Sequence, residues 1–362
     1  MTKMYLMLKN TPVLEIEEYR CRIRREELLP VSLRYPDVSY DDVLHGWTEN
    51  RTMSIGRTNA KKLLAGFRIS QSNPYRIARM FHFASLLDCY WMKEEGEDLT
   101  WEQVSLFANP LERAVSATAL LGVNQSFRSL KQRIHTPEFT LQGMSAKAWI
   151  REEDGLYLYK VGKRELPACQ ILAALGIPHV HYTEVGEDRL EQIADRVHID
   201  RVYESGEKVV KSRILSSEET AMVPWEDFQV YCSYQDKNEY DLVKKMDPDN
   251  YYGMQIADFI LGNEDRHGAN FGFFMDNESG HLKGLHPLLD HDHAFSVDED
   301  IPSQTSEEEE TLYQAAARAI QMMETDLSKI MAMEQPGELK EREWEMVQRR
   351  CRRLRTVQGH SG

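Results

Sequence analysis

Three polar side chains in the second half of the chain have types and spacing suited to phosphoryl transfer. The run NEDRHGANFG at 263–272 contains Asp265 and, five residues later, Asn270, and Asp290 follows in HPLLD at 286–290. In phosphoryl transfer one carboxylate orients the attacking hydroxyl, while an amide and a second carboxylate hold magnesium against the phosphates of ATP. We therefore predict that Asp265 is catalytic and that Asn270 and Asp290 are ligands of Mg²⁺, which prefers hard oxygen donors.

The elements around these residues are predicted to bring them together. The pattern at 252–262 indicates a helix that leads into a loop at 263–270, and 271–275 and 281–289 read as the two strands of a hairpin. The hairpin would return Asp290 towards the start of its first strand, as shared magnesium coordination requires. Catalytic groups usually lie on loops and element ends held by such rigid structure.

The neighbouring residues are predicted to support the loop. We expect Arg266 and His267 to orient the adjacent aspartate by hydrogen bonding, with an approach to phosphate or substrate as the alternative. His291 and His293 flank Asp292 in an H-x-H pair. Zinc would need further His or Cys ligands at recognisable spacing, so we predict histidines that are solvated or hydrogen-bonded beside the metal-binding aspartate.

An upstream lysine and glutamate could grip the nucleotide. The segments 146–150 and 156–161 read as a strand hairpin that carries Lys160, and 164–175 reads as a helix with Glu165 at its start. A strand lysine paired with a helix glutamate is the device with which kinases hold the α- and β-phosphates. Many lysine–glutamate pairs are surface ion pairs that contribute little to stability. The assignment of this pair to nucleotide binding therefore depends on its order relative to the downstream residues.

The order and spacing of these residues resemble the catalytic loop and metal-binding aspartate of protein kinases. Each aspartate alone would suit a capping residue of a surface loop, but the string N-x-D-R-H-x-x-N-F-G favours the kinase interpretation. In this string His267 follows the Asp-Arg pair, and in this order the chain resembles the HipA-like serine/threonine kinase family. The resemblance covers roughly 138–300. It implies ATP and Mg²⁺ as cofactors and an α+β, two-lobed protein-kinase-like fold, with a small β-rich N-lobe and a mostly helical C-lobe.

The resemblance also implies a nucleotide-binding loop at 140–147. This loop lacks G-x-G-x-x-G and the Walker pattern, but it is similar to the family's S-x-x-G-x-x-x-K, with Thr140, Gly143 and Lys147 at the matching places. Backbone amides around a glycine can approach phosphate closely. Gly143, Lys147, Lys160, Glu165, Asn270 and Asp290 are thus the expected cofactor-binding residues. In family members the loop serine can be autophosphorylated, so phosphorylation of Thr140 is a hypothesis.

We predict a mainly helical N-terminal region of unknown role at 1–135, and a HipA-like kinase domain at 136–362 with lobes at 136–222 and 223–362. The N-terminal region does not resemble the β-rich N-terminal subdomain of the best-known HipA proteins. Its start reads as a strand or hairpin. Helices are expected at 56–66, 75–93, 100–102 as a first turn, 112–121 and, in the C-terminal tail, 311–333.

Composition narrows the class of protein. The chain has 362 residues, 41% of them hydrophobic, and a formal net charge of −15. Such acidity disfavours binding to nucleic acid or to anionic membranes, and the basic run at 349–355 reads as the end of a helix. Five scattered cysteines without a Cys-x-x-Cys pair favour reduced thiols. The start lacks the features of a signal peptide, so we expect a cytoplasmic protein.

The leading hypothesis is an ATP- and magnesium-dependent kinase acting on serine or threonine of a protein, with Asp265 and Lys160 as catalytic residues. The resemblance implies a toxin-type or autophosphorylating kinase and an antitoxin-like partner. A small-molecule or lipid kinase would use the same catalytic parts. A nucleotide-binding regulatory protein without turnover is the third possibility, although it would not need the full set of site residues. A DNA-binding module is disfavoured by the acidic charge and by the lack of a recognisable basic recognition helix.

Overall fold

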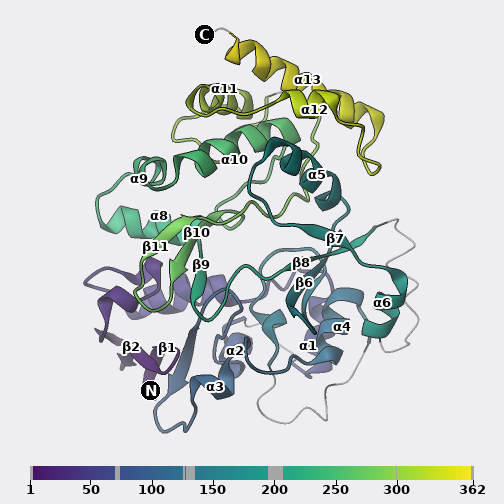
Figure 1. The fold of residues 1–362 in the computed structure, drawn as a ribbon. Coiled ribbons are helices and arrows are strands. Elements are labelled where there is room, and N and C mark those ends of the chain that lie inside the picture. The colour runs from purple at the N-terminus through teal and green to yellow at the C-terminus, as the bar shows by residue number, and fades with distance from the viewer. Residues whose placement is uncertain are drawn as a thin grey trace. The chain divides into compact units, whose positions relative to one another are not determined.

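The computed structural model describes residues 3–69, 74–124, 127, 135–194, 207–298 and 300–359 (Figure 1). The chain forms two compact units. Unit 1 comprises 1–161, 184–223 and 274–282, and unit 2 comprises 162–183, 224–273 and 283–362. The chain passes from one unit to the other at 161/162, 183/184, 223/224, 273/274 and 282/283. The domain boundary at 135/136 and the lobe boundary at 222/223 stay predictions.

Unit 1 begins with an antiparallel sheet. Its strands are β1 (Met4–Leu8), β2 (Thr11–Glu17), β3 (Arg20–Ile23) and β4 (Tyr90–Glu94), in the order β3–β2–β1–β4. The central strand β1 pairs with β2 on one side and with β4 on the other. The N-terminal region is therefore not only helical, because beyond the strand or hairpin expected at its start it contains a four-stranded sheet.

The helix predicted at 75–93 is wrong over most of its length. The structure has the short helix α2 (Pro74–Met80), and the chain then takes left-handed backbone conformations at His82 and Phe83, with φ of 55° and 56°. Residues 90–92 are buried in β4, where they pair with β1. Apolar residues at helical spacing also suit a buried strand of aromatic residues, and here strand pairing overrides the helical pattern.

The second sheet of unit 1 contains the predicted hairpin. It has the order β5–β6–β8–β7, with β5 (Lys147–Glu152), β6 (Gly155–Val161), β7 (Tyr182–Glu184) and β8 (Val209–Arg213). The helices α1 (Ala60–Gly66), α4 (Arg113–Leu121) and α6 (Glu187–Ile193) share a hydrophobic core with this sheet. Met53, Leu63 and Phe127 of the N-terminal region therefore pack in the same core as Ala148 and Tyr159 of the hairpin.

Short helical segments complete unit 1. The predicted first turn at 100–102 is α3 (Trp101–Val104), which Thr100 and Gln103 cap reciprocally. The others are η1 (Glu26–Leu28), η2 (Val31–Leu33), η3 (Asp42–Trp47), η4 (Glu49–Arg51) and η5 (Pro137–Phe139).

A third sheet has the order β11–β10–β9, with β9 (Thr220–Pro224), β10 (Gly272–Asp276) and β11 (Leu282–Leu285). The chain passes from one unit to the other within each of these strands.

Unit 2 is mostly helical, as expected. The helix α5 (Glu165–Leu175) ends at Gly176, whose φ of 71° suits a glycine cap. The following helices are α8 (Trp225–Tyr234), α9 (Glu239–Met246), α10 (Pro248–Leu261), α11 (Leu312–Met322), α12 (Ser328–Ala332) and α13 (Glu341–Gln358). The expected helix at 311–333 is two helices, because Met323 is extended.

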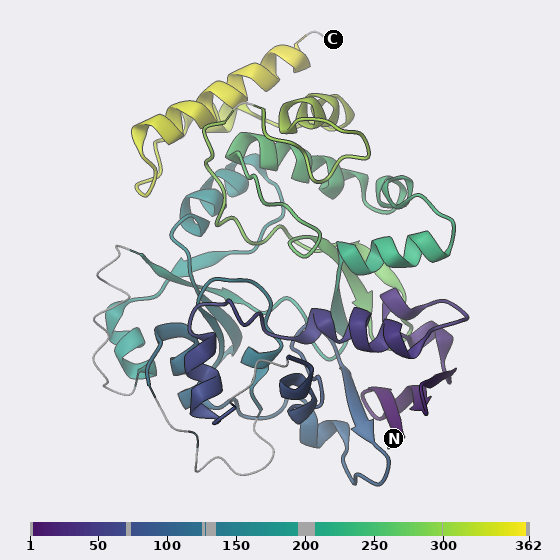
Figure 2. The same ribbon diagram turned by 180° about the vertical axis from the view of Figure 1, so that it is seen from behind.

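The C-terminal helices pack on α10, which leads into the candidate catalytic loop. Both α11 and α13 contact α10, as seen from behind in Figure 2. The buried face of α10 includes Ile256, Phe259 and Ile260. The basic run at 349–355 lies within α13, where Arg350 is buried.

Within the described residues, no helix combines the length and the apolar character needed to cross a membrane.

Candidate active site

The candidate catalytic loop begins where α10 ends. Gly262 has a φ of 61°, and a Cβ there would lie 2.7 Å from the carbonyl oxygen of Ser296 and would also collide with Arg350. Only glycine fits this backbone and this space without strain. The side chain of Arg350 is buried and donates to the carbonyl of Asp298 over 2.6 Å. The C-terminal helix α13 therefore packs directly against the start of the loop.

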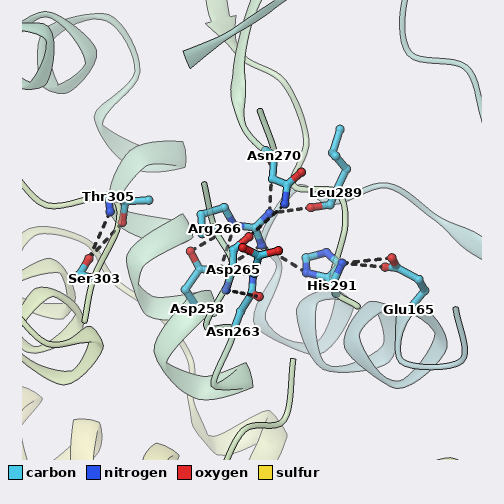
Figure 3. Close-up of polar contacts among 10 residues, drawn as sticks. All are labelled: Glu165, Asp258, Asn263, Asp265, Arg266, Asn270, Leu289, His291, Ser303 and Thr305. Atoms are coloured by element: carbon cyan, nitrogen blue, oxygen red, sulfur yellow. Dashed lines mark hydrogen bonds and ion pairs between the residues drawn. The ribbon is translucent and has the colours of Figure 1, made fainter. Parts of the chain in front are cut away.

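Arg266 holds the loop together from inside unit 2 (Figure 3). Its side chain is 1% exposed and forms an ion pair with Asp258 of α10, which is fully buried, at 3.0 Å. Asn263 also donates to Asp258, over 3.2 Å. Burial raises the pKa of the Asp258 carboxyl, and the charge of Arg266 opposes that shift. Arg266 thus supports the loop through Asp258, a buried partner that was not expected from the sequence, and its predicted role of orienting Asp265 stays a prediction.

The same arginine joins the loop to the segment before Asp290. One nitrogen, Nη1, donates to the carbonyl of Asn270 at 3.2 Å and to that of Leu289 at 2.5 Å. The backbones at Asn270 and Leu289 therefore lie side by side, as the return of the hairpin was expected to achieve. A second nitrogen, Nη2, lies 3.3 Å from Nδ1 of His291.

Asp265 and Asn270 face each other across the loop. The side-chain nitrogen Nδ2 of Asn270 donates to the backbone carbonyl of Asp265 over 3.0 Å, and the Asn270 side chain is largely buried. The carboxylate of Asp265 is 42% exposed, and Nε2 of His267 and Nε2 of His293 each lie 3.9 Å from its Oδ2. The loop is therefore fixed through its backbone, while the carboxylate remains open to a reactant.

Asp290 is held in an unusual backbone conformation between fixed neighbours. Its φ is 58°, which is uncommon for a residue with a side chain. Before it, Leu288 forms a parallel bridge with His179. After it, the backbone N–H of His291 donates to both carboxylate oxygens of Glu165, at 3.1 and 3.2 Å. Strained backbone held by its surroundings is typical of functional sites.

A third carboxylate lies beside Glu165 and Asp290. One oxygen from each of Glu165, Asp290 and Asp292 lies within 4.8 Å of the others, a spacing that could hold a metal ion. Asp292 was expected only as the centre of an H-x-H pair and not as a third carboxylate. Its position two residues after a predicted metal ligand is the signal that could have identified it.

The predicted residues of unit 1 form a separate group. Lys147 of β5 and Lys160 of β6 are cross-strand partners, and both side chains are buried. Gly143 has a φ of 87°, and a Cβ there would lie 2.5 Å from Nζ of Lys147. Ammonium groups can bind phosphate oxygens, and nucleotide binding by these residues stays a prediction. The structure therefore groups Gly143, Lys147 and Lys160, while Glu165 belongs to the group in unit 2.

Thr140 starts the loop with a buried hydroxyl. The Thr140 side chain is 3% exposed, and Oγ1 donates to the carbonyls of Ala84 and Pro137, both at 3.1 Å. In this conformation the hydroxyl is not open to a phosphate donor. Phosphorylation of Thr140 stays a prediction, and it would require the loop to leave this position.

A buried glutamate just before the loop makes the stability of unit 1 depend on pH. Burial raises the pKa of Glu138 from 4.5 to about 7, opposed by hydrogen bonds from Ser116 and from the backbone of Trp149 and by the charge of Arg57. Because the folded pKa is raised, the neutral carboxyl contributes stability below pH 4.5 that is lost as the pH rises through about 7. We expect the free energy of unfolding, relative to Glu138→Gln, to fall by about 3 kcal/mol between pH 4.5 and 8 in denaturant titrations. A difference that stays constant over this range would contradict the assignment.

Comparison with known proteins supports the fold. No protein-family model matches the sequence, and no curated protein matches it. Among solved structures, HipA in the HipA–HipB–operator DNA complex of Shewanella oneidensis MR-1 is 12% identical, with 99% of both chains covered and a TM-score of 0.53. The proinflammatory kinase CtkA of Helicobacter pylori is 14% identical, with 59% of this chain and 92% of that chain covered and a TM-score of 0.40. WaaP in complex with acyl carrier protein is 13% identical, with 60% and 80% covered and a TM-score of 0.29.

The chain has a protein-kinase-like α+β fold, and this fold is similar to that of HipA. The resemblance to HipA-like kinases is thus confirmed at the level of the fold. The likeness spans 99% of both chains, so it also includes residues 1–135. Beyond the strand or hairpin expected at its start, this region contains the four-stranded sheet of β1 to β4.

Proposed function

We propose that this protein is a kinase that transfers the γ-phosphoryl group of ATP, with Mg²⁺, to serine or threonine of a protein. The observation that carries the proposal is that one buried arginine, Arg266, joins the loop of Asp265 and Asn270 to Leu289, the residue before Asp290. The carboxylates and the amide oxygen are hard donors that fit Mg²⁺, and the two buried lysines fit phosphate. The HipA-like fold supports the same reaction class.

Each residue has a defined part in this reaction. Asp265 would accept the proton of the acceptor hydroxyl as the hydroxyl oxygen bonds to phosphorus and the bond from phosphorus to the leaving oxygen of ADP breaks. Asn270 and Asp290 would hold the ion, which neutralises charge on the phosphates when it is bound. Lys147, Lys160 and the amides around Gly143 would bind the phosphates. Pairing of Lys160 with Glu165 remains part of this proposal.

Two other functions remain candidates for the same residues. A small-molecule or lipid kinase would use the same catalytic parts, and a nucleotide-binding regulatory protein would keep binding without turnover. The HipA structure contains HipB and operator DNA. By that likeness we propose an antitoxin-type protein partner for this chain, and the net charge of −15 argues against direct binding of nucleic acid.

A labelling experiment separates these functions. The purified protein is incubated with γ-labelled ATP and Mg²⁺, alone and with cell lysate. Label on serine or threonine of a lysate protein supports the proposal, and label only in small molecules or lipids supports the first alternative. Saturable ATP binding with no label anywhere, including on the protein itself, would support the regulatory alternative and contradict the proposal.

Asp290→Asn should weaken binding of Mg-ATP by about tenfold or more, because it removes the charge of a direct metal ligand. Asparagine tolerates the left-handed backbone at this position, whereas alanine would add strain. Calorimetry with a non-hydrolysable ATP analogue, with and without Mg²⁺, measures the effect. Asp300→Asn, which changes an exposed carboxylate of the same unit, is the control and should bind as the wild type does. Equal affinity of Asp290→Asn and wild type would refute the role of Asp290.

A further inference from the structure

The candidate nucleotide loop at 140–147 is attached to one short segment of the N-terminal region. The backbone N–H of Met53 donates to the carbonyl of Phe139 over 2.8 Å, and that of Thr58 donates to the carbonyl of Met144 over 2.9 Å. These two bonds fasten both flanks of the loop's first half to residues 53–58.

Side chains add bonds between the same two segments. The amide of Gln142 donates to the carbonyls of Thr52 at 2.9 Å and Glu49 at 3.3 Å. In the opposite direction, Arg57 donates to the carbonyls of Glu138 at 2.9 Å and Leu141 at 3.3 Å. Arg57 is 2% exposed, so its two bonds are made away from water, where their loss costs most.

The tip of the loop is fitted closely against the same segment. A Cβ at Gly56 would lie 2.9 Å from Cε of Met144. The hydroxyl of Ser54 lies 3.5 Å from the sulfur of Met144. Backbone bonds, side-chain bonds and close packing therefore all join residues 49–58 to residues 138–144.

We infer that residues 49–58 form a clamp that fixes the nucleotide-binding conformation of loop 140–147, with Arg57 as its central positioning residue. This inference rests on the proposed function of that loop, and it gives the N-terminal region a role in the kinase reaction. A loop already held in its binding conformation loses less entropy when nucleotide binds. Loosening the clamp should therefore weaken nucleotide binding more than it slows turnover at saturating ATP.

The test uses the full chain with two clamp variants and one control. Gln142→Glu removes both N–H donors at an exposed position, so it should not disturb the fold. Arg57→Lys keeps the charge but replaces the guanidinium that reaches two carbonyls. The control is Arg151→Lys, because Arg151 donates to carbonyls of Leu106, Phe107 and Asn109, outside the clamp.

We measure hydrogen exchange of the amides at 140–146 without nucleotide, and the affinity for Mg-ATP. The loss of about one net hydrogen bond corresponds to a change of about fivefold. Both clamp variants should show exchange at least about fivefold faster and affinity about fivefold weaker, with a larger change in KM than in kcat, and the control should match wild type. Gln142→Lys, which restores a donor, should recover part of the affinity.

Unchanged exchange in both clamp variants would overturn the inference, and so would faster exchange with unchanged affinity for nucleotide. The exchange measurement needs no enzymatic activity. Failure of the wild-type protein to bind ATP would therefore overturn the proposed function of the loop, while the clamp itself would still be tested.

Discussion

Asp265→Asn should reduce phosphoryl transfer by a factor of about 10² to 10⁴, the usual contribution of a positioned general base. The substitution keeps the size of the side chain and removes its ability to accept a proton. Asn270 bonds to the backbone carbonyl of Asp265, which the substitution keeps, whereas His267 and His293 each lie 3.9 Å from the carboxylate. Affinity for Mg-ATP should therefore stay within about fivefold of wild type, since one net hydrogen bond is the most that such a change could affect.

Single-turnover transfer from γ-labelled ATP, measured beside the affinity for Mg-ATP, checks this separation of chemistry from binding. Glu264→Gln is the matched control, because it neutralises an exposed carboxylate one residue away in the same loop. Transfer by Asp265→Asn at more than a tenth of the wild-type rate would show that Asp265 is not the base. Equal losses in both variants would point instead to a general effect of charge on the loop.

Much of the candidate site could be predicted from the sequence because its residues lie close together along the chain. The loop after α10 and the hairpin of β10 and β11 follow from local signals: an apolar helical pattern, Gly262 at its end and a turn between two strand patterns. The hairpin of β5 and β6 was equally clear. In each case local propensity and the final structure agree, as natural sequences usually do.

The parts that were missed depend on contacts between distant residues. Asp258 reads as one polar residue on an apolar helix, and only the fold shows that it is the buried partner of Arg266. Similarly, β4 pairs with β1, from Met4 with Glu94 to Leu8 with Tyr90, and this distant pairing leaves no local signal against the helical pattern of its residues. The bonds between residues 49–58 and the loop at 140–147 also join backbone groups far apart in sequence, for which residue types give no signal.

The buried ion pair suggests a test that separates stability from catalysis. Arg266→Met leaves Asp258 buried without its partner, which should lower the free energy of unfolding by about 3–5 kcal/mol. The double variant Arg266→Met with Asp258→Leu removes both charges, and an apolar pair of similar volume should restore most of that loss. The exposed pair of Arg79 and Glu94 is the control, and Arg79→Met should cost less than about 1 kcal/mol.

Activity of the double variant then tests what Arg266 does for the site. Arg266 donates through one nitrogen to the carbonyls of both Asn270 and Leu289. A stable double variant therefore lacks the bonds that keep Asn270 beside the segment carrying Asp290. We expect its denaturant midpoint to approach that of wild type while transfer from γ-labelled ATP falls by about 10²-fold, the loss that follows from a misplacement of about 1 Å. If transfer recovered together with stability, the arginine would serve only the fold, and the shared placement of Asn270 and Asp290 would not depend on it.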